Sequence, residues 1–426
     1  MKLYKFILSI VFSCIFLYSN AQDDAALYFR GAIKENRINA RRNIINNIIY
    51  KNLSLPLTDS TEENWEDAFW AMEVLQYKLP WANDCVHHAF DAIGKRSVDF
   101  QHALIELCYA NYPGEFDIQV NQLIEKINDE KLFALCAEYL AQTDSSDTTR
   151  IYLLSQLDKD NKIYGWNQTQ NNLLTILANR FHQQEKLSTE KILSSFFSKS
   201  FLKKNIVVFS IQRKNRDYPG IVIVRDASGN FIKNNDGSIF NVPQLARSIS
   251  NLPFYLTNGN TPQGVFRMDG FGVSGADFIG PTENIQLTMP YETSIKHFLN
   301  NPSITDTSWT PDLYKKLLPD DLKDYLPLYE SYYAGEAGRT EIIAHGTTID
   351  PEYYKNKTYY PETPTMGCLC TEEVWSPTDG KRLISDQQNL IDAIKKAGGP
   401  NGYYVVIEID DEQIPVNIKE ILPFIK

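Results

Sequence analysis

The stretch Ile206-Val207-Val208-Phe209-Ser210-Ile211 decides the fold of the second half of this 426-residue chain. It is a short and almost wholly apolar run, rich in β-branched and aromatic residues. Ile221-Val222-Ile223-Val224 repeats the pattern after a polar loop that ends in Pro219-Gly220. Short apolar runs bounded by Gly and Pro are typical of buried strands. From about residue 203 onward we therefore expect a mainly β domain.

The rest of this half supports the same interpretation. The segment at about 290–335 is helical and acidic, and we expect it to form a helical insertion between strands. Further strands are predicted at 252–256, 265–268, 341–344 and 403–409. We therefore assign 201–426 to one domain.

The preceding residues, 22–200, show the spacing of helices instead. Ala103, Leu104, Leu107 and Cys108 recur at i, i+3 and i+4, and neighbouring segments repeat the pattern. Closely spaced helices separated by short breaks predict an all-α domain of stacked helical hairpins. A HEAT-like solenoid and an irregular bundle are both compatible with this spacing. The fold class is thus a multidomain α + β chain.

The first residues predict the compartment. Lys2 and Lys5 precede a thirteen-residue apolar run at 6–18, and Ser19-Asn20-Ala21 supplies the small residues that a signal peptidase requires. We predict a signal peptide at 1–21 and a mature chain that is exported to the periplasm or cell envelope. An N-terminal membrane anchor is the alternative, although the run is short for a bilayer span.

Composition excludes some classes of protein. The formal net charge of −11 argues against a nucleic-acid partner, since binding to phosphates depends on Lys and Arg. Beyond the signal segment the cysteines are odd in number and few, so no disulfide framework is expected. Three lie in apolar helical patterns and two in a polar segment containing glycine: Cys85, Cys108, Cys136, Cys368 and Cys370.

We expect the catalytic residues in two segments. A predicted strand runs into His345-Gly346, and Gly367-Cys368 follows, with Cys368 23 positions after His345. A thiol requires a base to ionise near neutral pH, and imidazole has a suitable pKa. The backbone amides of Gly367 and Cys368 are candidate oxyanion donors. A buried cysteine with an unrelated histidine is one alternative. A metal site at Cys368 and Cys370 with His345 is another, but it lacks a clear fourth ligand, so we predict no metal.

These stretches are similar to the signature of the YkuD-type L,D-transpeptidases. His345-Gly346-Thr347 matches the first part of the signature, and the Thr-x-Gly-Cys-Leu run at 365–369 matches the second. Upstream, 260–266 is similar to the Thr-Pro-x-Gly-x-Phe turn of that family. Two positions differ, because Met366 stands where the family usually has His and Cys370 where it has Arg or Asn. The resemblance covers roughly residues 203–426.

The resemblance implies a β-sandwich-like catalytic domain with the helical insertion as a lid. It implies an enzyme in which Cys368 attacks the stem peptides of peptidoglycan and His345 moves the proton. Thr365, Gly346 and Thr347 would position the substrate. No cofactor is implied.

Several alternatives stay open. The acyl-enzyme would be resolved by an amine, giving 3-3 cross-links, or by water in an L,D-carboxypeptidase or endopeptidase. A catalytically inactive wall-binding or scaffold protein is the rival from another class. The helical domain is a candidate site for a protein partner, and the sequence leaves the oligomeric state open.

Overall fold

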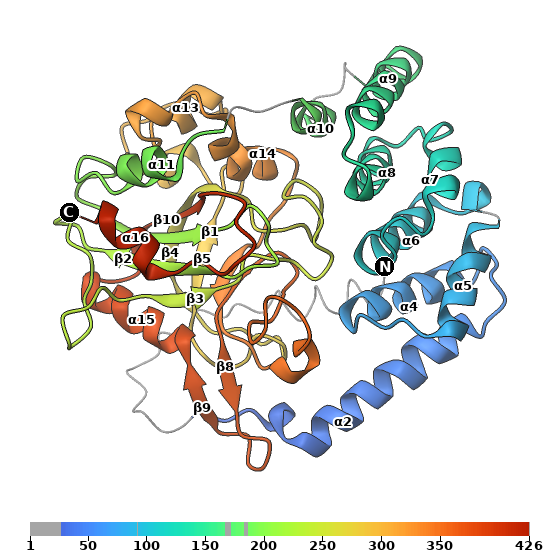
Figure 1. The fold of residues 1–426 in the computed structure, drawn as a ribbon, viewed down its shortest axis with the longest axis horizontal. Coiled ribbons are helices and arrows are strands. Elements are labelled where there is room, and N and C mark those ends of the chain that lie inside the picture. The colour runs from blue at the N-terminus through green and yellow to red at the C-terminus, as the bar shows by residue number, and fades with distance from the viewer. Residues whose placement is uncertain (1–26, 92, 167–171, 183–185, 426) are drawn as a thin grey trace. The chain divides into compact units, whose positions relative to one another are not determined.

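The computed structural model describes residues 27–91, 93–166, 172–182 and 186–425. The predicted signal peptide at 1–21 therefore lies outside the described residues. Helices and a large mixed sheet are both present (Figure 1), which confirms the predicted α + β character of the chain.

Contacts divide the chain into two units. A helical unit contains 37–184 and, from much later in the chain, 249–259. A sheet unit contains the described residues up to Asn36, then 185–248 and 260–426. This division differs from the predicted boundary between 200 and 201, because the last helix before the sheet groups with the sheet unit.

The helical unit is built from helices with defined starts. Ser97, Asp129 and Ser146 each accept a hydrogen bond from the backbone amide three residues later, which satisfies one of the free donors at a helix start. The elements of this part of the chain are α2 (Lys34–Asn43), the π-helical segment η2 (Ile44–Tyr50), α3 (Lys51–Leu53), α4 (Glu62–Val74), α5 (Pro80–Phe90), η3 (Ile93–Lys95), α6 (Val98–Asn111), α7 (Asp117–Ile124), α8 (Glu130–Thr143), α9 (Asp147–Tyr164) and α10 (Leu173–Phe181).

Four helices of this unit, α4, α6, α8 and α10, form a continuous stack. Helix α4 packs against α6, α6 against α8, and α8 against α10. Of the residues with helical spacing, Leu104 and Leu107 are fully buried in this stack and Ala103 is half-buried. Cys108 and Cys136 are buried there as expected, whereas Cys85 is only half-buried. The HEAT-like solenoid stays a prediction.

The segment 249–259 does not form the predicted strand. It is a chain of turns, and its side chains bond to helices of the helical unit. Tyr255 donates to Glu138 at 2.9 Å, and Asn258 donates to Glu106 at 2.9 Å. The apolar pattern at 252–256 thus reflects burial against helices, which periodicity alone does not distinguish from burial in a sheet.

The sheet unit contains an eight-stranded mixed sheet in the order β3-β2-β1-β10-β4-β5-β6-β7, and a separate hairpin of β8 and β9. The pairs β1/β10 and β6/β7 are parallel, and the other pairs of the large sheet are antiparallel. The strands are β1 (Ile206–Gln212), β2 (Gly220–Arg225), β3 (Val242–Gln244), β4 (Gly264–Gly272), β5 (Asn284–Thr288), β6 (Ile343–His345), β7 (Leu369–Cys370), β8 (Glu373–Trp375), β9 (Arg382–Ser385) and β10 (Asn401–Glu408).

Both faces of the sheet are covered by helices (Figure 1). On one face, Phe209 and Val405 join a core with Phe196 of α11 (Thr189–Phe196) and Ile421 of α16 (Ile418–Ile421). On the other face, α15 (Asp386–Ala397) contacts β1, β2, β3 and β5. This two-sided burial explains why the central strands read as continuous apolar runs.

The predicted helical insertion at about 290–335 is a set of short helices between β5 and β6. Their side chains Phe298, Tyr314 and Tyr332 belong to the same core as the sheet residues. The insertion is therefore part of this core, and its role as a lid stays a prediction. Its helices are α12 (Ile295–Phe298), α13 (Pro311–Lys315), η5 (Asp320–Leu322), η6 (Leu326–Tyr329) and α14 (Glu330–Glu336).

Candidate active site

The strand pairing at the edge of the sheet joins the two motif segments. Strand β6 (Ile343–His345) runs parallel to β7 (Leu369–Cys370), and His345 is the register partner of Cys370. Cys368 immediately precedes β7, so it lies two residues before that partner. The structure thus brings the histidine and cysteine segments together at the sheet edge, with an offset of two residues between the side chains of His345 and Cys368.

The turn that carries Cys368 is held by two threonine hydroxyls. Thr365 Oγ1 donates to the Cys368 carbonyl at 2.9 Å and accepts from the Gly367 amide at 3.0 Å. Thr261 Oγ1 donates to the Gly367 carbonyl at 2.8 Å. The φ of Gly367 is +115°, which favours glycine. Thr365 therefore has the geometry of a residue that positions the turn.

The Cys368 sulfur lies against the chain that leads into β6. The Ile343 amide donates to Sγ at 3.5 Å, and Sγ is 3.6 Å from the Glu341 carbonyl oxygen. Burial is the largest cause that raises the pKa of this thiol, to about 11, while the Ile343 amide and the charge of Arg339 oppose the shift. A thiol with this pKa is protonated at neutral pH.

His345 is a buried base with a defined tautomer. Its side chain is 5% exposed, and Nδ1 donates to the Gly346 carbonyl, which leaves the lone pair on Nε2. Burial lowers the pKa of His345 to about 4, so the ring is neutral at pH 7. In the part of the chain that the structure describes, no hydrogen bond joins His345 to Cys368.

Gly346 and Thr347 fix the loop that follows β6. A Cβ atom at Gly346 would lie 2.3 Å from the carboxyl of Glu373, so a larger residue there would force the Glu373 side chain to move. Thr347 is buried, its hydroxyl accepts from the Ile349 amide at 3.1 Å, and its carbonyl accepts from Trp375 Nε1 at 2.7 Å. Both residues, predicted to position substrate, hold the protein backbone in this structure.

The two backbone amides predicted as oxyanion donors, those of Gly367 and Cys368, differ in their hydrogen bonding. The Gly367 amide already donates to Thr365 Oγ1. The Cys368 amide has no hydrogen-bond partner among the residues that the structure describes. Only the Cys368 amide is thus free to stabilise a developing oxyanion.

Cys370 has a different environment from Cys368. It is 1% exposed, and its sulfur lies 3.6 Å from Thr363 Oγ1. Burial raises its pKa well above the ordinary value, and Glu362 and Glu373 raise it further. This thiol is therefore the less reactive of the pair.

Sequence reasoning missed Glu373 as a neighbour of the histidine loop. Its carboxylate accepts hydrogen bonds from Thr282 at 2.7 Å and from Ser385 at 2.5 Å. Burial raises the pKa of Glu373 to about 7. In the sequence it stands in a short polar stretch, which gave no sign that its side chain is buried beside Gly346.

Arg339 and Gln387 are two further site residues that the sequence did not reveal. Arg339 is 8% exposed, and its Nη1 donates to the Asn260 carbonyl at 2.8 Å. Gln387, on α15, is fully buried and donates to the Ala344 carbonyl at 3.1 Å. Both residues lie far in sequence from the groups that they hold, and neither belongs to a recognisable motif.

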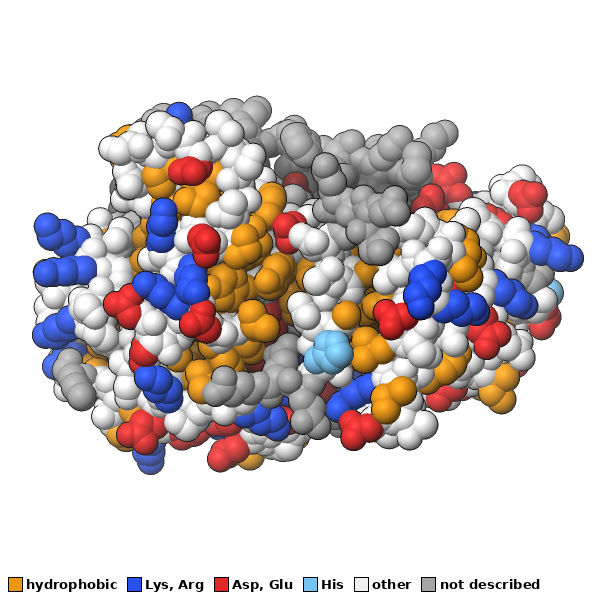
Figure 2. All heavy atoms as spheres, turned by 90° about the horizontal axis from the view of Figure 1, so that it is seen from above, with side chains coloured by type: hydrophobic (Ala, Val, Ile, Leu, Met, Phe, Trp, Pro, Cys, Tyr) orange, Lys and Arg blue, Asp and Glu red, His pale blue; other side chains and the backbone are white. Residues whose placement is uncertain are grey.

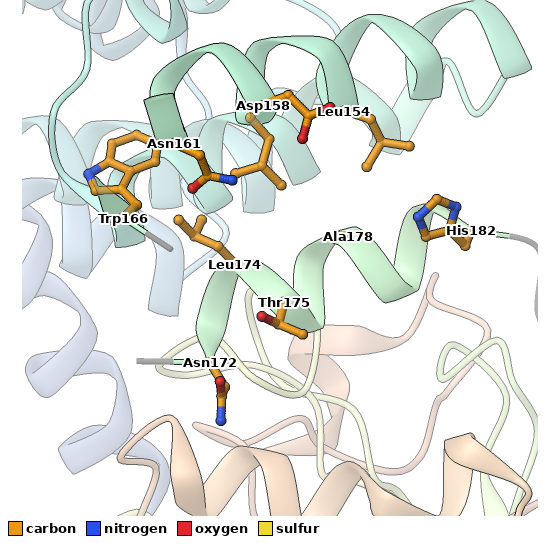
Figure 3. A pocket seen from close by; sticks show the side chains of 10 residues that line it. Leu154, Asp158, Asn161, Trp166, Asn172, Leu174, Thr175, Ala178 and His182 are labelled. Atoms are coloured by element: carbon orange, nitrogen blue, oxygen red, sulfur yellow. The ribbon is translucent and has the colours of Figure 1, made fainter. Parts of the chain in front are cut away.

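A separate cavity of about 370 Å³ lies within the helical unit (Figure 3). Side chains of α9 and α10 surround it, together with Trp166, Asn172 and His182, which lie just outside these two helices. None of the residues predicted for the active site lines this cavity. On the face shown in Figure 2, acidic and basic side chains are interspersed.

Comparisons with known proteins give no match with a family model, a curated protein or a solved structure. Among the described residues, no helix combines the length and apolar character that crossing a membrane requires. The L,D-transpeptidase resemblance therefore stays a prediction based on the motif residues.

Proposed function

We propose that this protein is an exported cysteine acyltransferase of the L,D-transpeptidase type that acts on peptidoglycan stem peptides. The observation that carries the proposal is the parallel pairing of β6 with β7, because it places His345 and Cys368 at one sheet edge. The free amide of Cys368 adds an oxyanion donor at the same place. This combination of nucleophile, base and donor suits acyl transfer.

In the proposed reaction, Cys368 Sγ attacks the carbonyl carbon on the L-centre of the third residue of a tetrapeptide stem, and Nε2 of His345 takes the thiol proton. The C–N bond then breaks, and His345 returns the proton to the departing D-alanine amine. An acceptor amine attacks the thioester, loses its proton to His345, and releases Cys368, which is protonated again. Water in place of the amine gives a carboxypeptidase.

The protonation states favour proton transfer during attack. The thiol of Cys368 and the ring of His345 are both neutral near pH 7, so no ion pair exists before the substrate binds. The proposal requires His345 to reach the sulfur in the substrate complex, where catalytic hydrogen bonds tighten.

A non-catalytic wall-binding protein is the second candidate. The absence of a hydrogen bond between His345 and Cys368, among the described residues, is the observation that favours it. The helical unit would then bind a partner while the sheet unit recognises the glycan-linked peptide.

Incubation of the protein with muropeptides, followed by mass analysis, tests these functions together. We expect a cross-linked dimer for a transpeptidase and a shortened monomer for a carboxypeptidase. Unchanged muropeptides that still bind the protein would support the binding module and contradict the enzyme.

The variant His345→Gln sharpens this test. We expect it to lose product formation while the pH profile of Cys368 alkylation stays the same, because the ring is not among the groups that shift the pKa of the thiol. A higher alkylation pH in this variant would show that His345 ionises the thiol before attack.

A further inference from the structure

We propose that Arg339 is the cationic residue of this site and that it stabilises the ionised sulfur of Cys368 during acyl transfer. This inference rests on the proposed function for the role of Cys368 as nucleophile. Arg339 acts through Cys368, so it is a positioning and activating residue.

One chain of contacts leads from the guanidinium to the cysteine turn. Arg339 Nη1 donates to the Asn260 carbonyl at 2.8 Å. The next residue, Thr261, donates from its hydroxyl to the Gly367 carbonyl at 2.8 Å. Gly367 precedes Cys368, so the loop that Arg339 holds is the loop that fixes the nucleophile.

A second route runs along the backbone that follows Arg339. The Glu341 carbonyl lies 3.6 Å from the Cys368 sulfur, and the Ile343 amide donates to that sulfur at 3.5 Å. The segment that begins with Arg339 therefore lies against the reactive atom. The guanidinium at the start of this segment is buried, and its charge lowers the pKa of the Cys368 thiol.

The groups near Cys368 shift the pKa of its thiol in opposite directions. Glu341, Glu292 and burial all raise the pKa of Cys368, and Arg339 is the cationic side chain that lowers it. Cys370 also lies near, as a thiol whose own pKa is raised. Burial lowers the pKa of Arg339 to about 10, so Arg339 stays charged at neutral pH.

Arg339 also supplies the positive charge that the motif lacks at position 370. Cys370 stands where the resemblance leads us to expect Arg or Asn, and Cys370 is a buried thiol without charge at neutral pH. The positive charge of this site comes from a residue 29 positions before Cys368. A cation supplied from another segment makes an arginine after the nucleophile unnecessary.

The experiment measures Cys368 alkylation by iodoacetamide as a function of pH, with peptide mapping to separate the cysteines. In Arg339→Gln we expect the midpoint for Cys368 to rise by about one pH unit, since a nearby opposite charge shifts a pKa by one unit or more. Arg339→Lys should retain most of the wild-type profile. Arg382→Gln is the control, because it removes a half-buried arginine of the sheet unit that is not among the groups that shift the pKa of Cys368.

A second measurement uses the wild-type protein and does not depend on a variant that folds. Iodoacetate is anionic and iodoacetamide is neutral, so their rate ratio reports the local charge. We expect this ratio to be at least about threefold higher at Cys368 than at Cys85. Cys85 is a suitable reference because it is half-buried and lies beside Asp84.

Equal ratios at the two cysteines would overturn the proposal, as would an unchanged midpoint in Arg339→Gln. Equal shifts in the Lys and Gln variants would also overturn it, because they would show a purely structural role. No substrate takes part in these measurements. If the alkylation midpoint of Cys368 depends on Arg339 but muropeptides stay unchanged, the effect of Arg339 on Cys368 is supported and the transpeptidase function is rejected.

Discussion

Two cysteines of the helical unit and Cys368 of the sheet unit lie in different environments. In the helical unit, Cys108 and Cys136 lie in the interiors of α6 and α8, fully buried. In the sheet unit, Cys368 lies on a turn before a strand, half-buried, with an amide and a carbonyl of another segment against its sulfur. Cys368 therefore differs from these two thiols both in burial and in the backbone groups that contact its sulfur.

The units also differ in how they are assembled. The helical stack is built mostly from neighbouring segments of the chain, as in α4, α6 and α8. The sheet places β10 between β1 and β4, so its centre requires the C-terminal segment. The helical unit is in turn completed by 249–259, which comes from the middle of the sheet segments.

The largest expected effect tests where one unit ends. A chain that begins at residue 199 lacks α11 and should lose cooperative unfolding, because Leu193 and Phe196 are fully buried in the core of the sheet unit. Loss of each such side chain costs about 2–5 kcal/mol, out of a typical stability of about 5–15 kcal/mol. Thermal unfolding followed by circular dichroism measures this.

A chain that begins at residue 185 is the control. It lacks residues 1–184, as the shorter chain does, but it keeps α11. It should unfold cooperatively and bind a hydrophobic dye through Phe254 and Tyr255, whose helical neighbours are removed. Equal behaviour of the two chains would contradict the boundary at 184 and 185.

A pair of cysteine variants should have opposite effects in the two units. Cys368→Ser should abolish covalent labelling by a carbapenem, an acylating agent of the family that the chain resembles, and change stability little. Cys108→Ser should keep the labelling but lose about 1–3 kcal/mol of stability, since it buries a hydroxyl inside α6.

Intact mass and chemical denaturation measure the two effects. Cys370→Ser should retain part of the labelling because the Cys370 thiol is buried beside Thr363 and is not the proposed nucleophile. Labelling that persists in Cys368→Ser and disappears in Cys370→Ser would reverse the roles of the two residues.

A smaller effect concerns the pH dependence of the sheet unit. Glu373 has a pKa of about 7 in the folded protein and about 4.5 when unfolded. Between these values the folded state keeps a proton that the unfolded state has lost, so stability falls as pH rises and then levels off above pH 7. Glu373→Gln should remove about 1–3 kcal/mol of this fall. Denaturant unfolding at pH 5 and pH 8 measures it, and an equal fall in both proteins would contradict the assignment.

The smallest effect should arise in the helical unit. Tyr255→Phe removes the hydrogen bond to Glu138, which also accepts from Arg180 at 2.7 Å. We expect a loss of about 1–2 kcal/mol in thermal unfolding, with carbapenem labelling of Cys368 unchanged. A loss of labelling would instead show that 249–259 governs the geometry of the site through its link to Asn260.

The amino-acid pattern was sufficient to predict the class of fold and several of the central strands. Short apolar runs and helical spacing report local burial, and these patterns placed β1, β2, β4 and β10 and the helices of the first half correctly. Pattern alone failed at 252–256, where apolar residues are buried in turns against helices. It also failed to group α11 with the sheet, because a helix looks the same in sequence whichever core it joins.

The features of the candidate site also separate into those predicted from the sequence and those seen only in the fold. The sequence indicated His345, Cys368 and Thr365, because a motif records which side chains are present and in what order. Only the folded chain reveals that the Gly367 amide is occupied, that Glu373 lies against Gly346, and that Arg339 donates to the Asn260 carbonyl. These are contacts between segments far apart in the chain, and pKa values depend on such contacts and on burial, which no local pattern encodes.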